Sequence, residues 1–170
     1  MAALVLTVIG DDRPGLVSSL AAAVAERGGS WQHSEMARLA GKFAGIVLVD
    51  VPGEQIEELR AALDGLGARD GLTVTMTAVE GADAGPARVL TLHLMGQDRP
   101  GIVQQVSAAL AEHGVSIEEL HTNTREAPMS GGMLFEARAV LRVPDGVAAD
   151  ALRPGLEDIA HELMVDLELS

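Results

Sequence analysis

Gly10-Asp11-Asp12-Arg13-Pro14-Gly15-Leu16-Val17 is a motif that this chain contains twice. The second copy is Gly96-Gln97-Asp98-Arg99-Pro100-Gly101-Ile102-Val103, which begins 86 residues later. Each copy follows a short apolar run typical of a strand and precedes apolar residues at helical spacing. The motif therefore marks the same junction, from a strand through a tight turn into a helix, at two places in the chain.

The similarity between the two copies extends well beyond the motif. Residues 4–31 align without gaps on residues 90–117, and 14 of these 28 positions are identical. This is far above chance and indicates a duplicated module. The second halves align less well, and the second copy has an additional loop, residues 126–132, where the first has only a turn at Gly41-Lys42.

Hydrophobic periodicity gives both modules the same order of elements, strand, helix, strand, strand, helix, strand. We expect the first module to have strands at 4–9, 30–40, 43–51 and 72–78 and helices at 16–24 and 56–66. The expected strands of the second module are 89–95, 116–125, 133–143 and 165–169, and its helices are 102–110 and 152–163. The apolar run at 4–9 predicts a central strand buried on both faces, and Pro154-Gly155 is expected to break or kink the last helix early.

This order predicts an α+β fold of two tandem ferredoxin-like βαββαβ modules. Each module would be an antiparallel sheet with helices on one face, and the other face would be left for water or a partner. The composition of residues 81–87 is typical of a linker, so we expect modules at 1–80 and 88–170. In the usual 4-1-3-2 strand order, the strands that carry His93 and His121 are not neighbours.

Composition excludes several classes of function. The net charge is −13 and no basic run is present, which argues against direct contact with nucleic acid. Aromatic residues make up only 2% of the chain, too few for the stacking platforms of single-strand binders. There is no cysteine, and neither a secretory leader nor a membrane span is present in the sequence. We therefore expect a cytoplasmic protein without membrane contact.

The repeated turn can bind a ligand or can simply cap a helix. Backbone N–H groups at a helix N-terminus have no partner within the helix and favour an anion, and Gly15 and Gly101 leave room for close approach. Asp12 and Asp98 would place a carboxylate beside these donors, an arrangement that suits a free amino acid. In the alternative interpretation, Asp12 caps the helix, Pro14 occupies its first turn, and no ligand binds.

No catalytic or metal-binding set emerges from the sequence. The five histidines do not converge in the predicted topology, so we expect no metal. The paired acidic residues are expected to be solvated, and no serine has a base positioned beside it. We therefore expect neither an enzyme nor a cofactor.

The chain resembles tandem ACT domains, small βαββαβ regulatory modules that sense amino acids. The resemblance rests on the Gly-x-Asp-Arg-Pro-Gly motif at Gly10 and Gly96 and on the Gly-x-Ser segment at Gly114-Val115-Ser116. Residues 121–125 and 127–135 more specifically resemble the glycine cleavage system transcriptional repressor family. The resemblance implies that small effectors bind where the strand-to-helix loop meets a neighbouring module. The implied ligand-binding residues are Asp11, Asp12, Arg13, Pro14, Gly15, Leu16, Val17, Gln97, Asp98, Arg99, Pro100, Gly101, Ile102 and Val103.

These features give a first hypothesis of a regulatory protein that binds a small amino acid, glycine or serine. It would act through a protein partner such as a transcription factor, possess no DNA-reading surface of its own, and form a homodimer. The second hypothesis is a structural interaction module without a ligand. ACT modules also resemble parts of formyltetrahydrofolate deformylase and of uridylyltransferases, but we expect neither of their catalytic domains here and no turnover of folate or nucleotide substrates. Because Asp11 and Gln97 differ and only the second copy has the additional loop, we favour Gly96–Val103 if one site is active.

Overall fold

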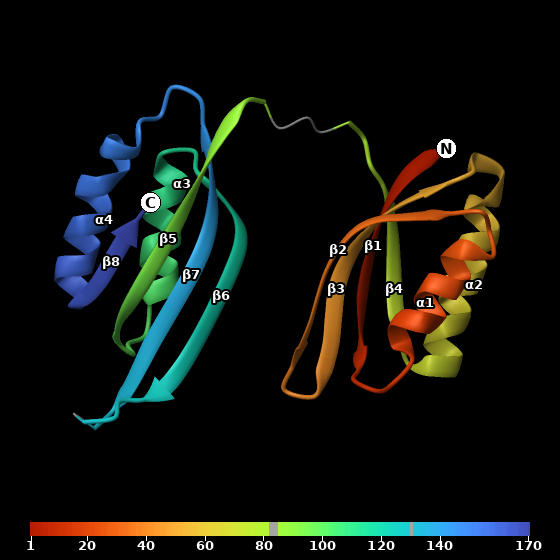
Figure 1. Ribbon diagram of the computed structural model, residues 1–170, viewed down its shortest axis with the longest axis horizontal. Helices are drawn as coiled ribbons and strands as arrows, with labels where there is room; N and C mark the ends of the chain where they lie inside the picture. The colour runs from red at the N-terminus through yellow and green to blue at the C-terminus, as the bar shows by residue number, and fades with distance from the viewer. Residues whose placement is uncertain (82–84, 130) are drawn as a thin grey trace. The chain divides into compact units, whose positions relative to one another are not determined.

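The computed structural model describes residues 1–81, 85–129 and 131–170. The chain divides into two compact units, residues 1–82 and 83–170 (Figure 1). Residues 82–84 of the predicted linker, and Ser130 in the additional loop, lie outside the described residues. Ala87, predicted as the last linker residue, is the first residue of a strand.

The first unit contains the predicted βαββαβ order. Its elements are β1 (Ala2–Asp11), α1 (Leu16–Ala25), β2 (Ser30–Leu39), β3 (Lys42–Val51), the short 3₁₀ helix η1 (Gly53–Gln55), α2 (Ile56–Asp70) and β4 (Thr73–Ala78). The sheet is antiparallel with strand order β2-β3-β1-β4, as predicted. The central position of β1 places the end of this strand, and with it the first copy of the motif, between β3 and β4.

The second unit repeats this arrangement. Its elements are β5 (Ala87–Gln97), α3 (Ile102–Glu112), β6 (Ser116–Glu126), β7 (Met133–Pro144), α4 (Ala149–Leu163) and β8 (Val165–Leu169). The strand order is β6-β7-β5-β8. Because β7 and β5 lie between β6 and β8, His121 on β6 and His93 on β5 are on strands that do not pair, as predicted.

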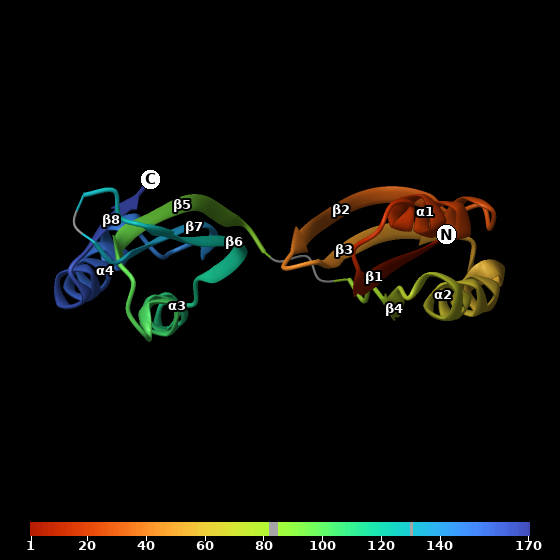
Figure 2. The same cartoon turned by 90° about the horizontal axis from the view of Figure 1, so that it is seen from below.

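Each unit has an aliphatic core between its helices and one face of its sheet (Figure 2). In the first unit the core is centred on Leu6, Val47 and Leu59, which are fully buried. Leu94, Leu141 and Leu152 form the corresponding core of the second unit. The helices therefore leave the opposite face of each sheet uncovered by their own unit. None of the helices in the described ranges is long and apolar enough to cross a membrane.

The prediction that residues 4–9 are buried on both faces is wrong. Leu4, Leu6 and Val8 are buried, whereas Thr7 and Ile9 are exposed, Ile9 to 52%. The reason is that both helices pack on one face only, so β1 is central in the sheet yet has an open side. The run lacks alternation because its outward-facing positions are also largely apolar.

The prediction that Pro154-Gly155 breaks the last helix early is also wrong, because α4 is a single helix from Ala149 to Leu163 with Pro154 inside it. Proline removes only one hydrogen bond here, the one that would reach the carbonyl of Asp150. Leu152 and Leu156, on either side of the proline, are both buried in the core of the unit. Their packing holds the helix together across the missing bond.

Candidate functional site

The two copies of the motif form equivalent loops, which we call the first loop (residues 10–17) and the second loop (residues 96–103). Each starts at the end of a central strand and finishes in the first turn of a helix. The glycine that opens each loop is required by close packing. A Cβ on Gly10 would lie 2.7 Å from the carbonyl oxygen of Gly71, and one on Gly96 would lie 2.4 Å from Cγ1 of Val165.

A left-handed glycine turns the chain into each helix. Gly15 has φ +93° and Gly101 has φ +92°, and each is the N-cap residue of its helix. Their carbonyl groups accept hydrogen bonds of 2.9 Å from the amides of Ser19 and Gln105. No heavy atom lies within 4 Å of a Cβ built on Gly15, so this turn is open to an approaching ligand.

The structure therefore corrects the capping interpretation. No side chain caps α1, and the helix begins at Leu16 rather than at Pro14. Asp12 does not cap because its carboxylate is engaged elsewhere, with Oδ2 2.7 Å from Nε of Arg38. The free N–H groups of the first helical turn are thus left without a side-chain partner.

Every charged side chain of the first loop is paired within the unit. Asp11 forms an ion pair with Lys42, and the hydrogen bond from Lys42 lowers the pKa of the Asp11 carboxyl below its ordinary value. Asp12 pairs with Arg38. Arg13 reaches the C-terminal end of α2, where its Nη2 lies 3.7 Å from Oδ1 of Asp70.

The second loop has the same backbone but lacks these pairs. The amide of Asp98 donates to the carbonyl of Met133 at 2.8 Å, just as the amide of Asp12 donates to that of Gly41 at 2.9 Å. The side chains of Gln97, Asp98 and Arg99, however, make no hydrogen bond or ion pair with any described residue.

The second loop lacks these ion pairs because the residues that correspond to Lys42, Arg38 and Asp70 are uncharged. In the sheet register Lys42 is opposite Asp11, whereas Leu134 is opposite Gln97. Arg38 corresponds to Thr124, since these residues pair with Phe43 and Phe135 respectively. Asp70 is the last residue of α2, and Leu163 is the last residue of α4. The sequence contains this signal, but only the register of the strands reveals which residues correspond.

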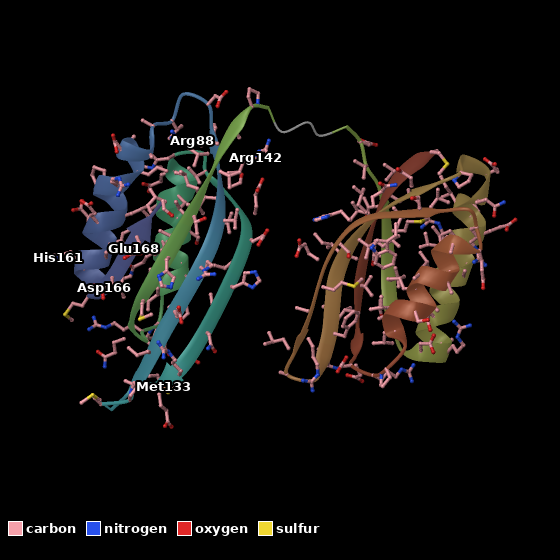
Figure 3. The ribbon with its side chains drawn as sticks, viewed as in Figure 1. Arg88, Met133, Arg142, His161, Asp166 and Glu168 are labelled. Carbon is pink, nitrogen blue, oxygen red and sulfur yellow. The ribbon has the colours of Figure 1, made fainter. Side chains whose placement is uncertain are left out.

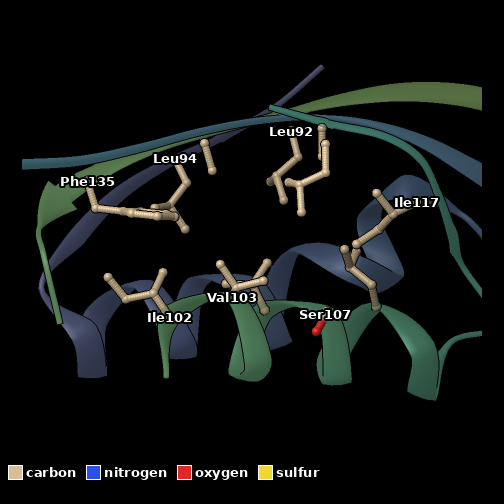
Figure 4. Close-up of a pocket in the computed structure, with 12 residues that line it drawn as sticks. Leu92, Leu94, Ile102, Val103, Ser107, Ile117 and Phe135 are labelled. Carbon is tan, nitrogen blue, oxygen red and sulfur yellow. The ribbon is translucent and has the colours of Figure 1, made fainter. Parts of the chain in front are cut away.

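A small apolar pocket lies beneath the second loop, between α3 and the sheet (Figure 4). Ile102 and Val103 of the loop line it, together with Phe135 and Ile117, and its one side-chain oxygen belongs to Ser107. Its volume is about 30 Å³, close to the share of one water molecule in the liquid. The charged ends of an amino acid need polar partners, so the outer surface of the loop is the better candidate site.

The remaining predicted residues form no further constellation. Among the described residues, no group of three or more His, Asp or Glu side chains is arranged to hold a metal ion. The motif residues thus form two separate loops. The charged side chains of the first loop are in ion pairs, and those of the second loop are in none with the described residues. Their role in ligand binding remains a prediction.

The sequence of this chain is similar to those of known proteins. The ACT domain family model matches residues 2–77 and again residues 88–170. The glycine cleavage system transcriptional repressor of Escherichia coli (strain K12) is 29% identical over 162 residues, which cover 94% of this chain and 85% of that protein.

Two solved structures have the fold of this chain. A protein of unknown function from Galdieria sulphuraria is 30% identical, with a TM-score of 0.88 over 99% of this chain and 97% of that one. A provisionally assigned glycine cleavage system transcriptional repressor has the same fold at 20% identity, with a TM-score of 0.76 over 99% of this chain and 96% of that one. With the family model matched once in each unit, this chain belongs to the ACT domain family and is a tandem ACT-domain protein.

Proposed function

We propose that this chain is a regulatory protein that binds a small amino acid, glycine or serine, at its second loop. Binding would change its contacts with a protein partner such as a transcription factor, and the process under control would be glycine cleavage. The ACT domain family and the name of the Escherichia coli relative support the regulatory part of this proposal.

The observation that carries the proposal is the unpaired state of Asp98 and Arg99. An amino acid offers a carboxylate and an ammonium group close together. The guanidinium of Arg99 and the free amides at the start of α3 can hold the carboxylate, and the carboxylate of Asp98 can hold the ammonium. In the first loop, the equivalent Asp12 and Arg13 are already neutralised by Arg38 and Asp70.

The action through a protein follows from the charge. A net charge of −13 without a basic run gives no surface suited to the phosphate backbone. A regulator of transcription with this charge would therefore act by contacting another protein. We propose a homodimer as the working form, because the edge strands β2 and β6 are long and mostly exposed and can pair with another chain.

A thermal-shift panel of the proteinogenic amino acids tests the proposal. A ligand that binds only the folded state raises the melting temperature, so glycine or serine at millimolar concentration should raise it in the intact chain. The variants Asp98→Ala and Arg99→Ala should reduce the rise, while the matched variants Asp12→Ala and Arg13→Ala should keep it in full. If no amino acid shifts melting, the sensing role is wrong.

These variants are better probes than a bulky replacement of the loop glycines. Gly15 and Gly101 have positive φ, so a β-branched residue such as valine would strain the backbone whether or not a ligand binds. Loss of binding in such a variant would not distinguish the loop from the fold.

The second candidate function is an interaction module without a ligand. The same edge strands favour it, since each presents a row of backbone groups to a partner strand. A partner complex whose stability is unchanged by glycine and serine would support this function over sensing.

A further inference from the structure

The open faces of the two sheets differ in chemistry although the folds are the same. In the first unit, the open face of β1, β3 and β4 carries mainly apolar and threonine side chains. These are Val5, Thr7, Ile9, Ala44, Ile46, Leu48, Thr73, Thr75 and Thr77. In the second unit, the equivalent positions are largely charged or polar. These are Thr91, His93, Met95, Glu136, Arg138, Val140, Asp166 and Glu168.

The fold does not require this polar face, because the duplicated unit folds without it. His93 occupies the position of Thr7, Arg138 that of Ile46, and Glu136 that of Ala44. The first unit has an acid–base pair on this face only at its edge strand β2, where His33 pairs with Glu35, whereas in the second unit the charged residues extend onto β5, β7 and β8. The polar face therefore points to a role specific to the second unit.

Two rows of side chains cross the four strands of this face. His121, Arg138, His93 and Glu168 form one row, and Asn123, Glu136, Met95 and Asp166 form the next. Asp166 and Glu168 both belong to β8, the far edge strand (Figure 3). On the β6 side, a shallow hollow is lined by His121, Asn123, Glu136 and Arg138, together with Thr122.

The hydrogen-bond partner of Glu136 on this face is His93 of β5. Its Nε2 lies 2.9 Å from Oε1 of Glu136, and the carboxylate accepts the hydrogen bond of the ring. Glu136 therefore bonds toward β5 rather than to Arg138. The exposed guanidinium of Arg138 makes no hydrogen bond or ion pair with the described residues.

The charges of the hollow select a ligand that carries both signs. A simple anion would meet Arg138 but would be repelled by Glu136. A simple cation would meet Glu136 but would be repelled by Arg138. Glu136 and Arg138 are two residues apart on one face of β7, a spacing of about 6.8 Å along an antiparallel strand. The ammonium and the carboxylate of one amino acid can therefore each meet one of these two side chains.

We propose that this hollow is a second amino-acid site of the chain, separate from the second loop and built for the zwitterionic head group. Arg138 and Asn123 hold the carboxylate, and Glu136, positioned by His93, holds the ammonium. The ligand class is that of the proposed function, but the residues are different, so the two sites can be tested independently.

The test is a titration of the ¹⁵N-labelled full chain with millimolar glycine, which is the head group without a side chain. Saturable shifts are expected at the amides of residues 121–123 and 136–138. Arg138→Ala and Glu136→Gln should each weaken binding there by about tenfold or more, the effect of losing a charged hydrogen bond. Arg138→Lys should bind more weakly than the wild type, because lysine cannot form the two-pronged contact with a carboxylate.

The controls separate this site from the loop and from simple charge. Arg60→Ala, an exposed arginine in the first unit, should bind glycine as the wild type does. Acetate and methylamine, which carry one charge each, should give no saturable shift on this face. Shifts confined to residues 96–103 would overturn this proposal and leave the proposed function standing. Acetate binding as tight as that of glycine would also overturn it, and absence of any shift would overturn both.

Discussion

Arg13 and Asp70 join the first loop to the end of α2, with Nη2 of the arginine 3.7 Å from Oδ1 of the aspartate. Arg13 Nη2 also donates a hydrogen bond of 3.3 Å to the carbonyl of Arg69. The second unit has Leu163 in place of the aspartate, and Arg99 makes no ion pair with the described residues. The first loop is therefore bound to α2 by an ion pair, whereas the charged side chains of the second loop have no such partner among the described residues.

A double-mutant cycle of Arg13→Ala and Asp70→Ala should show a coupling energy of about 0.2–1 kcal/mol, the range of partly exposed ion pairs. Urea unfolding followed by the fluorescence of Trp31 measures it, because this is the only tryptophan and it packs against the core of the first unit. Arg99→Ala, as the control, should change the stability of the second unit by less than about 0.5 kcal/mol. A coupling of zero would mean that the pair does not fasten the loop.

The glycines that open the two loops should not tolerate alanine. Gly96→Ala would bring its Cβ within 2.4 Å of Val165 Cγ1 and 2.9 Å of Val165 Cα, and the Cβ of Gly10→Ala would meet the Gly71 carbonyl oxygen at 2.7 Å. Overpacking of this kind costs about 1–3 kcal/mol. Calorimetric unfolding should show the loss in the unit that carries the change.

Gly65→Ala is the matched control for these two variants. Gly65 lies inside α2, and nothing lies within 4 Å of a Cβ built there. Alanine should therefore stabilise the first unit by about 0.5–1 kcal/mol through helix propensity. If Gly96→Ala proved equally harmless, the close approach of β5 to β8 would not be the reason for the glycine.

Much of the fold could be predicted because its signals are local. The alternation at 133–143, the helical spacing at Leu59, Leu63 and Leu66, and the duplicated motif each depend on neighbouring residues. They predict the element order and the family, and the strand order is the usual one of this fold. The buried state of 4–9 could not be predicted, because an apolar run does not tell which face of a strand the helices will cover.

The sequence predicted the two loops of the candidate site but not the partners of their side chains. The motif identified both loops, yet the partners of Asp12 and Arg13 are Arg38 and Asp70, distant residues that only the folded register brings close. The polar face was missed for the same reason. His121 and Glu136 lie on separate strands, and their common hollow depends on how β6 and β7 pair.

Glu136 should make the stability of the second unit depend on pH in acid solution. The hydrogen bond from His93 lowers the pKa of Glu136 below its ordinary value of 4.5. A carboxyl with a lower pKa in the folded state stabilises it fully above the unfolded value, and this contribution is lost as the pH falls through the folded value. The difference in melting temperature between wild type and Glu136→Gln should thus shrink as the pH falls below about 5.

His93→Ala is the control for this dependence, because it removes the donor and leaves the carboxylate. The difference in melting temperature between wild type and His93→Ala should also shrink as the pH falls below about 5. Calorimetry across the same pH range measures it. A difference that grows as the pH falls would contradict the assigned direction of the pKa shift.

Ala139→Val should stabilise the second unit by filling the pocket beneath α3. The two units show why: Leu6 pairs with Val47 in the first, and the equivalent Leu92 pairs with Ala139 in the second. Ala139 lines a pocket of about 30 Å³, and cavity filling typically adds about 0.5–2 kcal/mol. Calorimetry should show the melting temperature of this unit rise by about 4–8 °C for each kcal/mol.

Val47→Ala makes the converse change and should destabilise the first unit by about 2–3 kcal/mol, seen by the fluorescence of Trp31. Ala139→Val should leave that signal unchanged. It should also leave glycine binding unchanged, because the pocket has no polar partner for a charged head group. If Ala139→Val destabilised the second unit, the walls of the pocket would already have relaxed to fill it. If the variant lost glycine binding, the ligand would lie beneath α3 rather than on the surface of the second loop.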